Sequence, residues 1–321
     1  MLKLKRTVAD FFTVERMSLT FFILYFLISF IFIENFSNPT NLRNILVQSS
    51  DLIILACGMT FVFMNGGIDF SITATIGLGS IMGAKVMTLP GNPVLMSILG
   101  ILVILGIGIL IGCVNGLTVT RLKMPSFIAT MATQLVFAGL ALWYTESATI
   151  GGLPKPFLLI GKGRFLGIPM PILIMAAVVA LCIYILHFTV LGRYIVAVGT
   201  NHQTSRISGI PVRKTIFLLF LFSGILAAIG SIVMTSRSGT GMPAMGKNML
   251  MDIVGAVIIG GTAVTGGKGN MLGTVTGAIL IIVLNNSLNL LGVEWYVINA
   301  LKGVMIIAVA LLGVWRTGGG R

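Results

Sequence analysis

Histidine and cysteine, the side chains that most often bind metals or act as nucleophiles, are few and scattered in this sequence. His187 stands at the end of an apolar run and His202 lies in a basic segment, so the two form no cluster. Cys57, Cys113 and Cys182 lie in apolar runs, neither paired by spacing nor accompanied by histidine. We therefore expect inert core cysteines and predict no metal site.

The glycine-rich segment 260–270 looks at first like a nucleotide-binding motif. A phosphate-binding loop requires a glycine, four further residues and then Gly-Lys-Ser/Thr. With Lys268 as the lysine, Thr262 occupies the position of the first glycine and Gly269 replaces the hydroxyl residue. The chain is therefore expected to lack an ATPase site of its own.

Carboxylates are also scarce, and most of them are expected at or beyond the ends of helices. The acidic residues are Asp10, Glu15, Glu34, Asp51, Asp69, Glu146, Asp252 and Glu294. A carrier coupled to a proton or cation gradient needs an ionisable group deep in the helix bundle. We expect none there, which argues against such a carrier. Asp69 follows two glycines and is expected to accept backbone N–H bonds at the start of a helix.

Asn285 and Asn286, near the end of a late apolar run, are the remaining candidates for binding. Their carboxamides could bind sugar hydroxyls along a transport path. They could equally form hydrogen bonds between neighbouring helices, and we favour this second interpretation.

The composition determines the class of protein that must position these residues. Hydrophobic residues make up 56% of the chain, charged residues make up 9%, and the mean hydropathy is +1.06. These values exclude a soluble domain of this length and indicate an all-α polytopic membrane protein. The 321 residues leave room for about eight to eleven spans and no separate soluble domain. We interpret the net charge of +13 as topology signals and contacts with anionic lipid, not as a nucleic-acid surface.

We predict about ten spans, which fits two five-helix halves of inverted topology. The predicted spans are 17–33, 45–64, 71–88, 94–120, 126–144, 170–188, 215–235, 250–259, 271–291 and 294–315. The first follows a basic segment with Lys3, Lys5 and Arg6 and lacks a small-residue cleavage site, so we expect an uncleaved helix. In the fourth, Gly108, Gly112 and Gly116 should let another helix approach closely.

Positive charge orients these spans with both termini in the cytoplasm. Most of the 21 lysines and arginines then lie inside, including Arg316 and Arg321. The outer loops keep six exceptions, which are Arg43, Lys155, Lys162, Arg164, Arg237 and Lys247.

The polar segment 190–214 lies between the sixth and seventh spans and contains Arg193, Arg206, Arg213 and Lys214 but no acid. Residues 203–210 could form a short helix with Thr204 as its cap, and Pro211 would prevent its continuation. The segment could be an ordinary basic loop that obeys the positive-inside rule, or a docking surface for a soluble partner.

Three ordered segments resemble the ribose-type permease family of ABC importers. In the first, 45–71, the family's Gly-Gly-Ile-Asp-Leu-Ser motif is matched by Gly66, Gly67, Ile68, Asp69 and Ser71, with Phe70 in place of leucine. Segment 192–210 is similar to the family's loop between the sixth and seventh spans. Segment 252–293 follows the family pattern at Gly260, Gly261, Thr262, Gly266 and Gly267. The departures are Ile72-Thr73, where the family usually has Val-Gly, and Met251, where an acid often stands.

The resemblance implies a single permease domain, 1–321, that pairs with a second copy or a paralogue in a bacterial cytoplasmic membrane. A separate ATPase subunit would use ATP and dock on the coupling segment, at Gly192, Arg193, Gly199, Asn201, Arg206, Gly209 and Arg213. Gly199 and Gly209 would permit tight turns at its ends. An extracytoplasmic sugar-binding protein would deliver a monosaccharide, such as a ribose-like pentose, for import by alternating access, with no cofactor bound by this chain.

Two other classes of function remain open. An ion-coupled secondary sugar carrier would need a buried, essential acid and no ATP. A membrane-embedded enzyme would need clustered acids, histidines or cysteines near one membrane face, and the sequence contains no such cluster.

Overall fold

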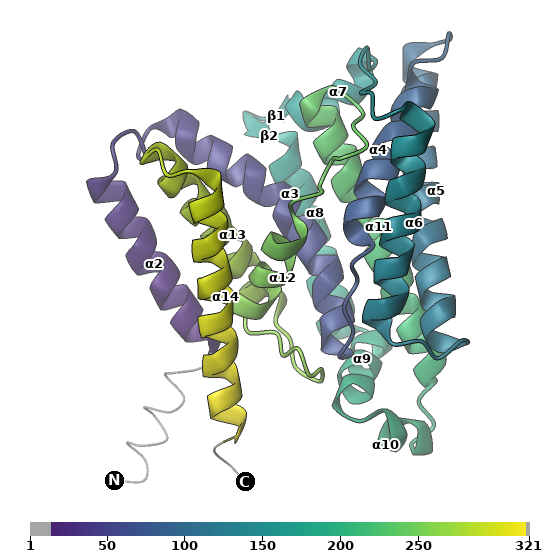
Figure 1. The fold of residues 1–321 in the computed structure, drawn as a ribbon, viewed down its shortest axis with the longest axis vertical. Helices are drawn as coiled ribbons and strands as arrows, with labels where there is room; N and C mark the ends of the chain where they lie inside the picture. The colour runs from purple at the N-terminus through teal and green to yellow at the C-terminus, as the bar shows by residue number, and fades with distance from the viewer. Residues whose placement is uncertain (1–13, 319–321) are drawn as a thin grey trace.

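The computed structural model describes residues 14–318, most of which are helical (Figure 1). The helices are α2 (Val14–Phe32), α3 (Pro39–Met64), α4 (Ile72–Met87), α5 (Pro93–Thr120), α6 (Ser126–Thr145), α7 (Lys155–Lys162), α8 (Met170–Phe188), α9 (Val190–Thr200), α10 (His202–Ile207), α11 (Val212–Ser238), α12 (Leu250–Ile259), α13 (Met271–Leu290) and α14 (Trp295–Gly318). Strands β1 (Arg164–Phe165) and β2 (Ile168–Pro169) form a small antiparallel hairpin.

Six of the described helices are long and apolar enough to cross a membrane, namely α3, α5, α6, α8, α11 and α13. Shorter apolar stretches occur in α2, α4, α9, α12 and α14. The predicted all-α polytopic membrane fold is therefore confirmed. Several charges used to orient the chain, on Lys3, Lys5, Arg6 and Arg321, lie outside the described residues, as does Asp10.

Helix α3 forms the centre of the bundle. Its residues from Ser49 to Met64 are all buried, because α11, α13, α8 and α12 pack around it. Figure 1 shows α3 between a group formed by α2, α12, α13 and α14 and a second group formed by α4, α5, α6 and α11. Because α3 packs against both groups, a displacement at its end would change the packing of both.

The start of α3 lies earlier than predicted, in a segment expected to be loop. Asn38 accepts a hydrogen bond from the Thr40 N–H, and Pro39 occupies the first turn, where its missing N–H has no cost. As a result Asp51 lies well inside the helix, where it is 1% exposed and paired with Arg237. The expectation that no acid is buried in the bundle was wrong for Asp51 and also for Asp69, likewise 1% exposed.

The basic segment 190–214 is more regular than predicted. Gly192, Ile195 and Val198 recur every three residues and are buried, so the segment begins with the amphipathic helix α9 and not with a loop. The short predicted helix is present as α10, but its cap is Asn201 and not Thr204. The Asn201 Oδ1 accepts the N–H groups of Gln203 and Thr204, both at 2.9 Å.

Segment 145–169, which was predicted to lie outside, also contains structure that the sequence interpretation missed. Pro154 precedes α7 and Pro156 lies in its first turn, so two prolines that suggested irregular chain define a helix start. Gly161, in the last turn of α7, packs against the backbone of α11, where its N–H donates to Ser236 Oγ.

The predicted glycine face of the fourth span is confirmed in α5. A Cβ atom at Gly108 would collide with the Gly224 carbonyl, and one at Gly112 would lie 2.7 Å from the Phe220 carbonyl. A Cβ atom at Gly116 would lie 2.7 Å from the ring of Phe217 and 3.1 Å from its carbonyl oxygen. Helices α5 and α11 therefore approach each other through backbone atoms, as small residues permit in membranes.

Gly108→Ala should destabilise the protein by about 1–3 kcal/mol, because the added methyl overpacks the α5–α11 contact. Gly106→Ala is the matched control, since no described atom lies within 4 Å of a Cβ atom built there. We expect a lower melting temperature in detergent for the first variant and an unchanged one for the second. Equal melting temperatures would contradict the backbone contact.

Candidate coupling site

Three glycine-containing segments that lie far apart in the sequence meet at the end of α9. They are the α3–α4 connection at 65–71, the last turn of α9 at 199–200, and the α12–α13 connection at 260–270. The Gly267 N–H donates a 2.8 Å hydrogen bond to the Met64 carbonyl, which joins the first and third segments directly. We name the contact among Met64–Gly67, Gly199–Thr200 and Gly266–Gly267 the coupling joint.

Gly199 is the residue through which α9 touches both other segments. A Cβ atom there would collide with the Met64 carbonyl and lie 2.6 Å from the Gly267 nitrogen. Gly199 was predicted to permit a tight turn, and this prediction was wrong, because the residue lies inside α9. Its role is close approach of backbones, which a residue with any side chain would prevent.

Gly266 and Gly267 need glycine for two reasons. Their φ angles are +88° and +79°, which lie in the left-handed region that other residues avoid. A Cβ atom at Gly266 would lie 2.8 Å from the Gly199 carbonyl, and one at Gly267 would lie 2.8 Å from Thr200 Oγ1. The joint is therefore made mainly of backbone atoms, with the Thr200 hydroxyl beside Gly267.

Asp69 fixes the α3–α4 connection to the surrounding helices. Its Oδ1 accepts hydrogen bonds from the Ser71 N–H at 3.0 Å and the Ser71 hydroxyl at 2.6 Å. Its Oδ2 accepts a 2.7 Å hydrogen bond from the Ser223 hydroxyl of α11, and Asn115 of α5 donates to Ser71 Oγ at 2.7 Å. The predicted backbone bond at the helix start is present, and the links to α5 and α11 add a buried network.

Helix α6 holds the same connection from another side. The Ile68 N–H donates to Ser126 Oγ at 3.2 Å, and the Phe70 N–H donates to Thr130 Oγ1 at 3.1 Å. With Asp69, these bonds tie the connection to α5, α6 and α11. The connection is thus hydrogen-bonded to three helices at once.

The α12–α13 connection contains the other residues singled out from the sequence. Gly260 ends α12, and Cβ atoms at Gly260 and Gly273 would each collide with the other residue's backbone. Gly261 follows with φ +84°, and Thr262 is buried. Helices α12 and α13 therefore pack backbone to backbone just before the chain reaches the joint.

A basic surface lies on the far side of α9 from the joint. Figure 1 shows α10 beyond the nearby ends of α3, α5 and α6. A cavity of about 800 Å³ here, which we name the α10 cavity, is lined by Lys123, His202, Gln203, Arg206, Ile210, Pro211, Val212, Arg213 and Lys214. The lining contains four cationic side chains and no carboxylate. It can therefore attract an acidic surface of a partner protein.

The residues predicted for the coupling segment thus separate into three groups. Gly192 and Gly199 pack inside against neighbouring backbone. Asn201 caps α10, and Gly209 turns the chain after it with φ +77°. Arg206 and Arg213 line the α10 cavity, whereas Arg193 is exposed on α9.

Asn285 and Asn286 both form hydrogen bonds between helices. Asn286 and Asn41 exchange two amide hydrogen bonds of 2.8 and 3.0 Å, which connect α13 with α3. Asn285 donates to Asp252 of α12 at 3.5 Å, and Asp252 in turn pairs with Lys302 of α14 at 2.7 Å. The sequence did not point to the Asp252–Lys302 pair, because its partners are 50 residues apart.

The geometry of the joint suits the transmission of movement and not covalent chemistry. Among residues 14–318, no group of three or more histidine, cysteine or acidic side chains could hold a metal ion. What the joint offers is a rigid connection from the exposed helix α10, through α9, to the ends of α3 and α12.

Comparison with known proteins agrees with this arrangement. Residues 41–310 match the family described as the permease component of branched-chain amino acid transport systems. The chain is 39% identical over 293 residues to the ribose import permease protein of Bacillus subtilis, covering 91% of this chain and 89% of the relative.

Two further relatives are similar over nearly their full length. The chain is 37% identical over 304 residues to the ribose import permease protein of Haemophilus influenzae, covering 94% and 93% of the two chains. It is 33% identical over 297 residues to the D-allose transport system permease protein of Escherichia coli, covering 91% and 90%. No solved structure matches the chain. The chain therefore belongs to the ribose-type permease family of ABC importers, as its motifs indicated.

Proposed function

We propose that this chain is the membrane-spanning subunit of an ATP-driven importer that moves a monosaccharide across a bacterial cytoplasmic membrane. The observation that carries the proposal is the coupling joint, where all three family segments meet on α9 next to the exposed helix α10 and the basic α10 cavity. Such a joint is what an importer needs if a separate subunit supplies the energy. The named sugars of the relatives, ribose and D-allose, make a small neutral or nearly neutral sugar the first substrate to test.

The proposed mechanism is alternating access. ATP binding and hydrolysis in the separate ATPase subunit move α10, and α9 passes the movement through Gly199 to the ends of α3 and α12. Because α3 packs against both helix groups, its displacement would rock one group against the other and open the path inward. The sugar undergoes no covalent change, and a path lined by uncharged polar groups would let it bind weakly and leave.

The proposed topology has ten spans, formed by α2 to α6 and by α8, α11, α12, α13 and α14. Two halves of five spans each would have inverted topology within a single domain. Figure 1 shows the beginning of α2 and the end of α14 on the same side of the bundle as α10. This supports cytoplasmic termini if α10 faces the ATPase.

The proposed partners are an ABC ATPase subunit at the α10 cavity, an extracytoplasmic sugar-binding protein at the opposite face, and a second permease chain, with lipids around the bundle. Purification from the native membrane in mild detergent tests these partners. A stoichiometric ATP-binding subunit is expected. A chain that purifies alone would contradict the proposal.

An ion-coupled carrier is the second candidate, because Asp51 and Asp69 are buried after all. Both carboxylates already have partners within the protein. Asp51 pairs with Arg237, and Asp69 accepts three hydrogen bonds from Ser71 and Ser223. A coupling acid must release its partners to exchange an ion, so these two acids support a structural role better.

Charge reversal in the α10 cavity should weaken docking of the ATPase. We expect Arg206→Glu and Arg213→Glu each to lower the affinity for that subunit at least about tenfold, because a like charge replaces an attractive one. Arg121→Glu is the matched control, since Arg121 is exposed in the α5–α6 connection and does not line the cavity. Affinity is measured by co-purification and by titration of the ATPase onto the purified permease. Unchanged affinity in both cavity variants would remove this docking role.

A further inference from the structure

One carboxamide lies in the middle of a spanning helix without a partner inside the chain. Gln134 is the ninth of the 20 residues of α6, which is long and apolar enough to cross a membrane. Its side chain is half-buried, and its amide atoms are not enclosed by protein. Within residues 14–318, the Gln134 amide forms no hydrogen bond with a side chain or with the backbone. Its two donors and its acceptor are therefore available to a ligand.

Carboxamides in other spanning helices show the usual arrangement. Asn115 of α5 donates to Ser71 Oγ at 2.7 Å, and Asn286 of α13 exchanges two hydrogen bonds with Asn41. A carboxamide in apolar surroundings is costly unless it has such a partner. Lipid chains cannot supply one, so polar side chains in membranes face the bundle interior, another helix or a water-filled cavity. The amide of Gln134 therefore needs a polar partner that is not part of the described chain.

Gln134 borders the face of α6 that packs against the rest of the protein. Helix α6 packs mainly against α4 and α5, and it stands at the edge of the bundle (Figure 1). One turn before Gln134, Thr130 is fully buried, and one turn after it Ala138 is half-buried. Met131, on the other side of Gln134, is 45% exposed. The amide thus lies where α6 leaves its packing partners and meets the space beside them.

Helix α6 is also connected to the coupling joint through the turn that precedes Gln134. Thr130 Oγ1 accepts a hydrogen bond from the Phe70 N–H, and the same hydroxyl lies 3.1 Å from the Ile68 carbonyl, to which it donates. A displacement of the α3–α4 connection would therefore shift the helix turn next to Gln134. Alternating access requires a group that contacts the cargo and moves with the coupling site.

The chemistry of Gln134 suits a neutral sugar. A carboxamide can both donate to and accept from a hydroxyl group, and it carries no charge. One or two such hydrogen bonds hold a sugar weakly, and weak binding is what a transport path requires for release.

We infer that Gln134 binds a hydroxyl group of the imported neutral sugar as the sugar passes along α6. This inference deepens the proposed function, on which it rests, by naming a residue of the transport path. Gln134 retains the sugar between its release on the outer side and its exit on the inner side. Without that bond, part of the sugar returns to the outer side while the ATPase cycle continues.

The test measures sugar uptake and ATP hydrolysis together, in proteoliposomes that contain the permease with its ATPase and binding-protein partners. The labelled sugars are ribose and D-allose, which the names of the relatives print. For Gln134→Met, which keeps the length of the side chain but removes the amide, we expect about two- to tenfold less sugar per ATP hydrolysed, the range that one hydrogen bond supports. Gln134→Asn keeps an amide and should restore part of the ratio. Met131→Leu, a change on the same side of α6 without a polar group, should leave the ratio unchanged.

Removing hydroxyl groups from the sugar tests the same bond from the other partner. Analogues of the transported sugar are prepared that each lack one hydroxyl. We expect one of them to give the unmodified permease the low ratio of Gln134→Met, and to cause no further fall in that variant, because the two changes remove the same interaction.

Three results would overturn the inference. The first is an unchanged ratio of sugar to ATP in Gln134→Met. The second is an equal fall in uptake and ATP hydrolysis with a lower melting temperature, which would make the residue structural. The third is loss of a second permease copy from the purified complex, which would place Gln134 in a contact between copies. Absence of ATP-dependent uptake of both sugars by the unmodified complex would instead count against the proposed function, so the two failures are distinguished.

Discussion

Replacing Gly199 by valine should abolish ATP-driven uptake while the ATPase subunit remains bound. The valine side chain cannot be accommodated, because even its Cβ would collide with the Met64 carbonyl and crowd the Gly267 nitrogen. Helix α9 must then separate from the ends of α3 and α12, and movement of α10 no longer reaches them. We expect uptake to fall at least about tenfold, within the range of typical coupling energies between sites. Docking should persist, because Arg206 and Arg213 are untouched.

The measurement is uptake of labelled sugar alongside ATPase co-purification. Gly199→Ala, a smaller change, should give an intermediate loss if valine proves too disruptive for folding. Gly139→Val is the matched control, because Gly139 also lies in a helix but has no described atom within 4 Å of its Cβ position. Normal uptake by both Gly199 variants would show that the joint does not transmit movement.

The second large effect is expected for Asp69→Ala. This change leaves the Ser71 N–H and the hydroxyls of Ser71 and Ser223 without their acceptor in a site where Asp69 is 1% exposed. Buried donors left without partners cost about 1–3 kcal/mol each, so the loss of stability should reach about 3 kcal/mol or more. Asp69→Asn should cost less, since its amide oxygen can still accept from Ser71.

The melting temperature of the purified protein in detergent measures this effect. Ser49→Ala provides a control in the neighbouring helix α3, because the Ser49 hydroxyl is buried without a partner among the described residues. Its removal should leave the melting temperature unchanged or raised. A normal melting temperature for Asp69→Ala would contradict the network.

Much of the fold could be predicted because long apolar runs have few alternatives in a membrane. The runs that became α4, α5, α6, α8, α11, α12 and α13 were located within a few residues. The incorrect predictions concerned single helices and helix ends, and each has a physical reason. Helix α9 was missed because its 11 residues include Gly192 and Gly199, which are poor helix formers, and lie in a segment that was interpreted as a basic loop. The start of α3 was missed because asparagine and proline indicate a loop as readily as a helix start.

The site was harder to predict, because its essential feature is contact between distant segments. The motifs singled out Gly66, Gly199 and Gly267, but no local pattern shows that their backbones touch. The same applies to Asp69, whose bond to Ser71 follows from helix-start rules while its bond to Ser223 spans 154 residues. Without the structure, Gly199 was therefore assigned to a turn that it does not form.

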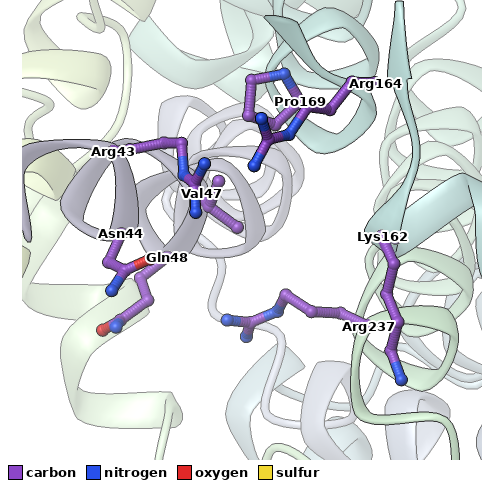
Figure 2. A pocket seen from close by; sticks show the side chains of 9 residues that line it. Arg43, Asn44, Val47, Gln48, Lys162, Arg164, Pro169 and Arg237 are labelled. Atoms are coloured by element: carbon purple, nitrogen blue, oxygen red, sulfur yellow. The ribbon is translucent and has the colours of Figure 1, made fainter. Parts of the chain in front are cut away.

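The basic residues of the loops predicted to lie outside show a related limit of sequence reasoning. Arg43, Lys162, Arg164 and Arg237 were exceptions to the charge rule that orients the chain. The structure places all four around one cavity (Figure 2). Charge counting treats each loop separately and could not group residues from α3, α7, β1 and α11.

The most direct test of the account is uptake of labelled ribose into proteoliposomes that contain the purified complex with its ATPase and binding-protein partners. Uptake is measured with ATP, with a non-hydrolysable ATP analogue, and with an imposed proton or sodium gradient but no ATP. We predict uptake only with hydrolysable ATP, and its loss in Gly199→Val. Uptake driven by an ion gradient in the absence of ATP would contradict the account and identify a secondary carrier.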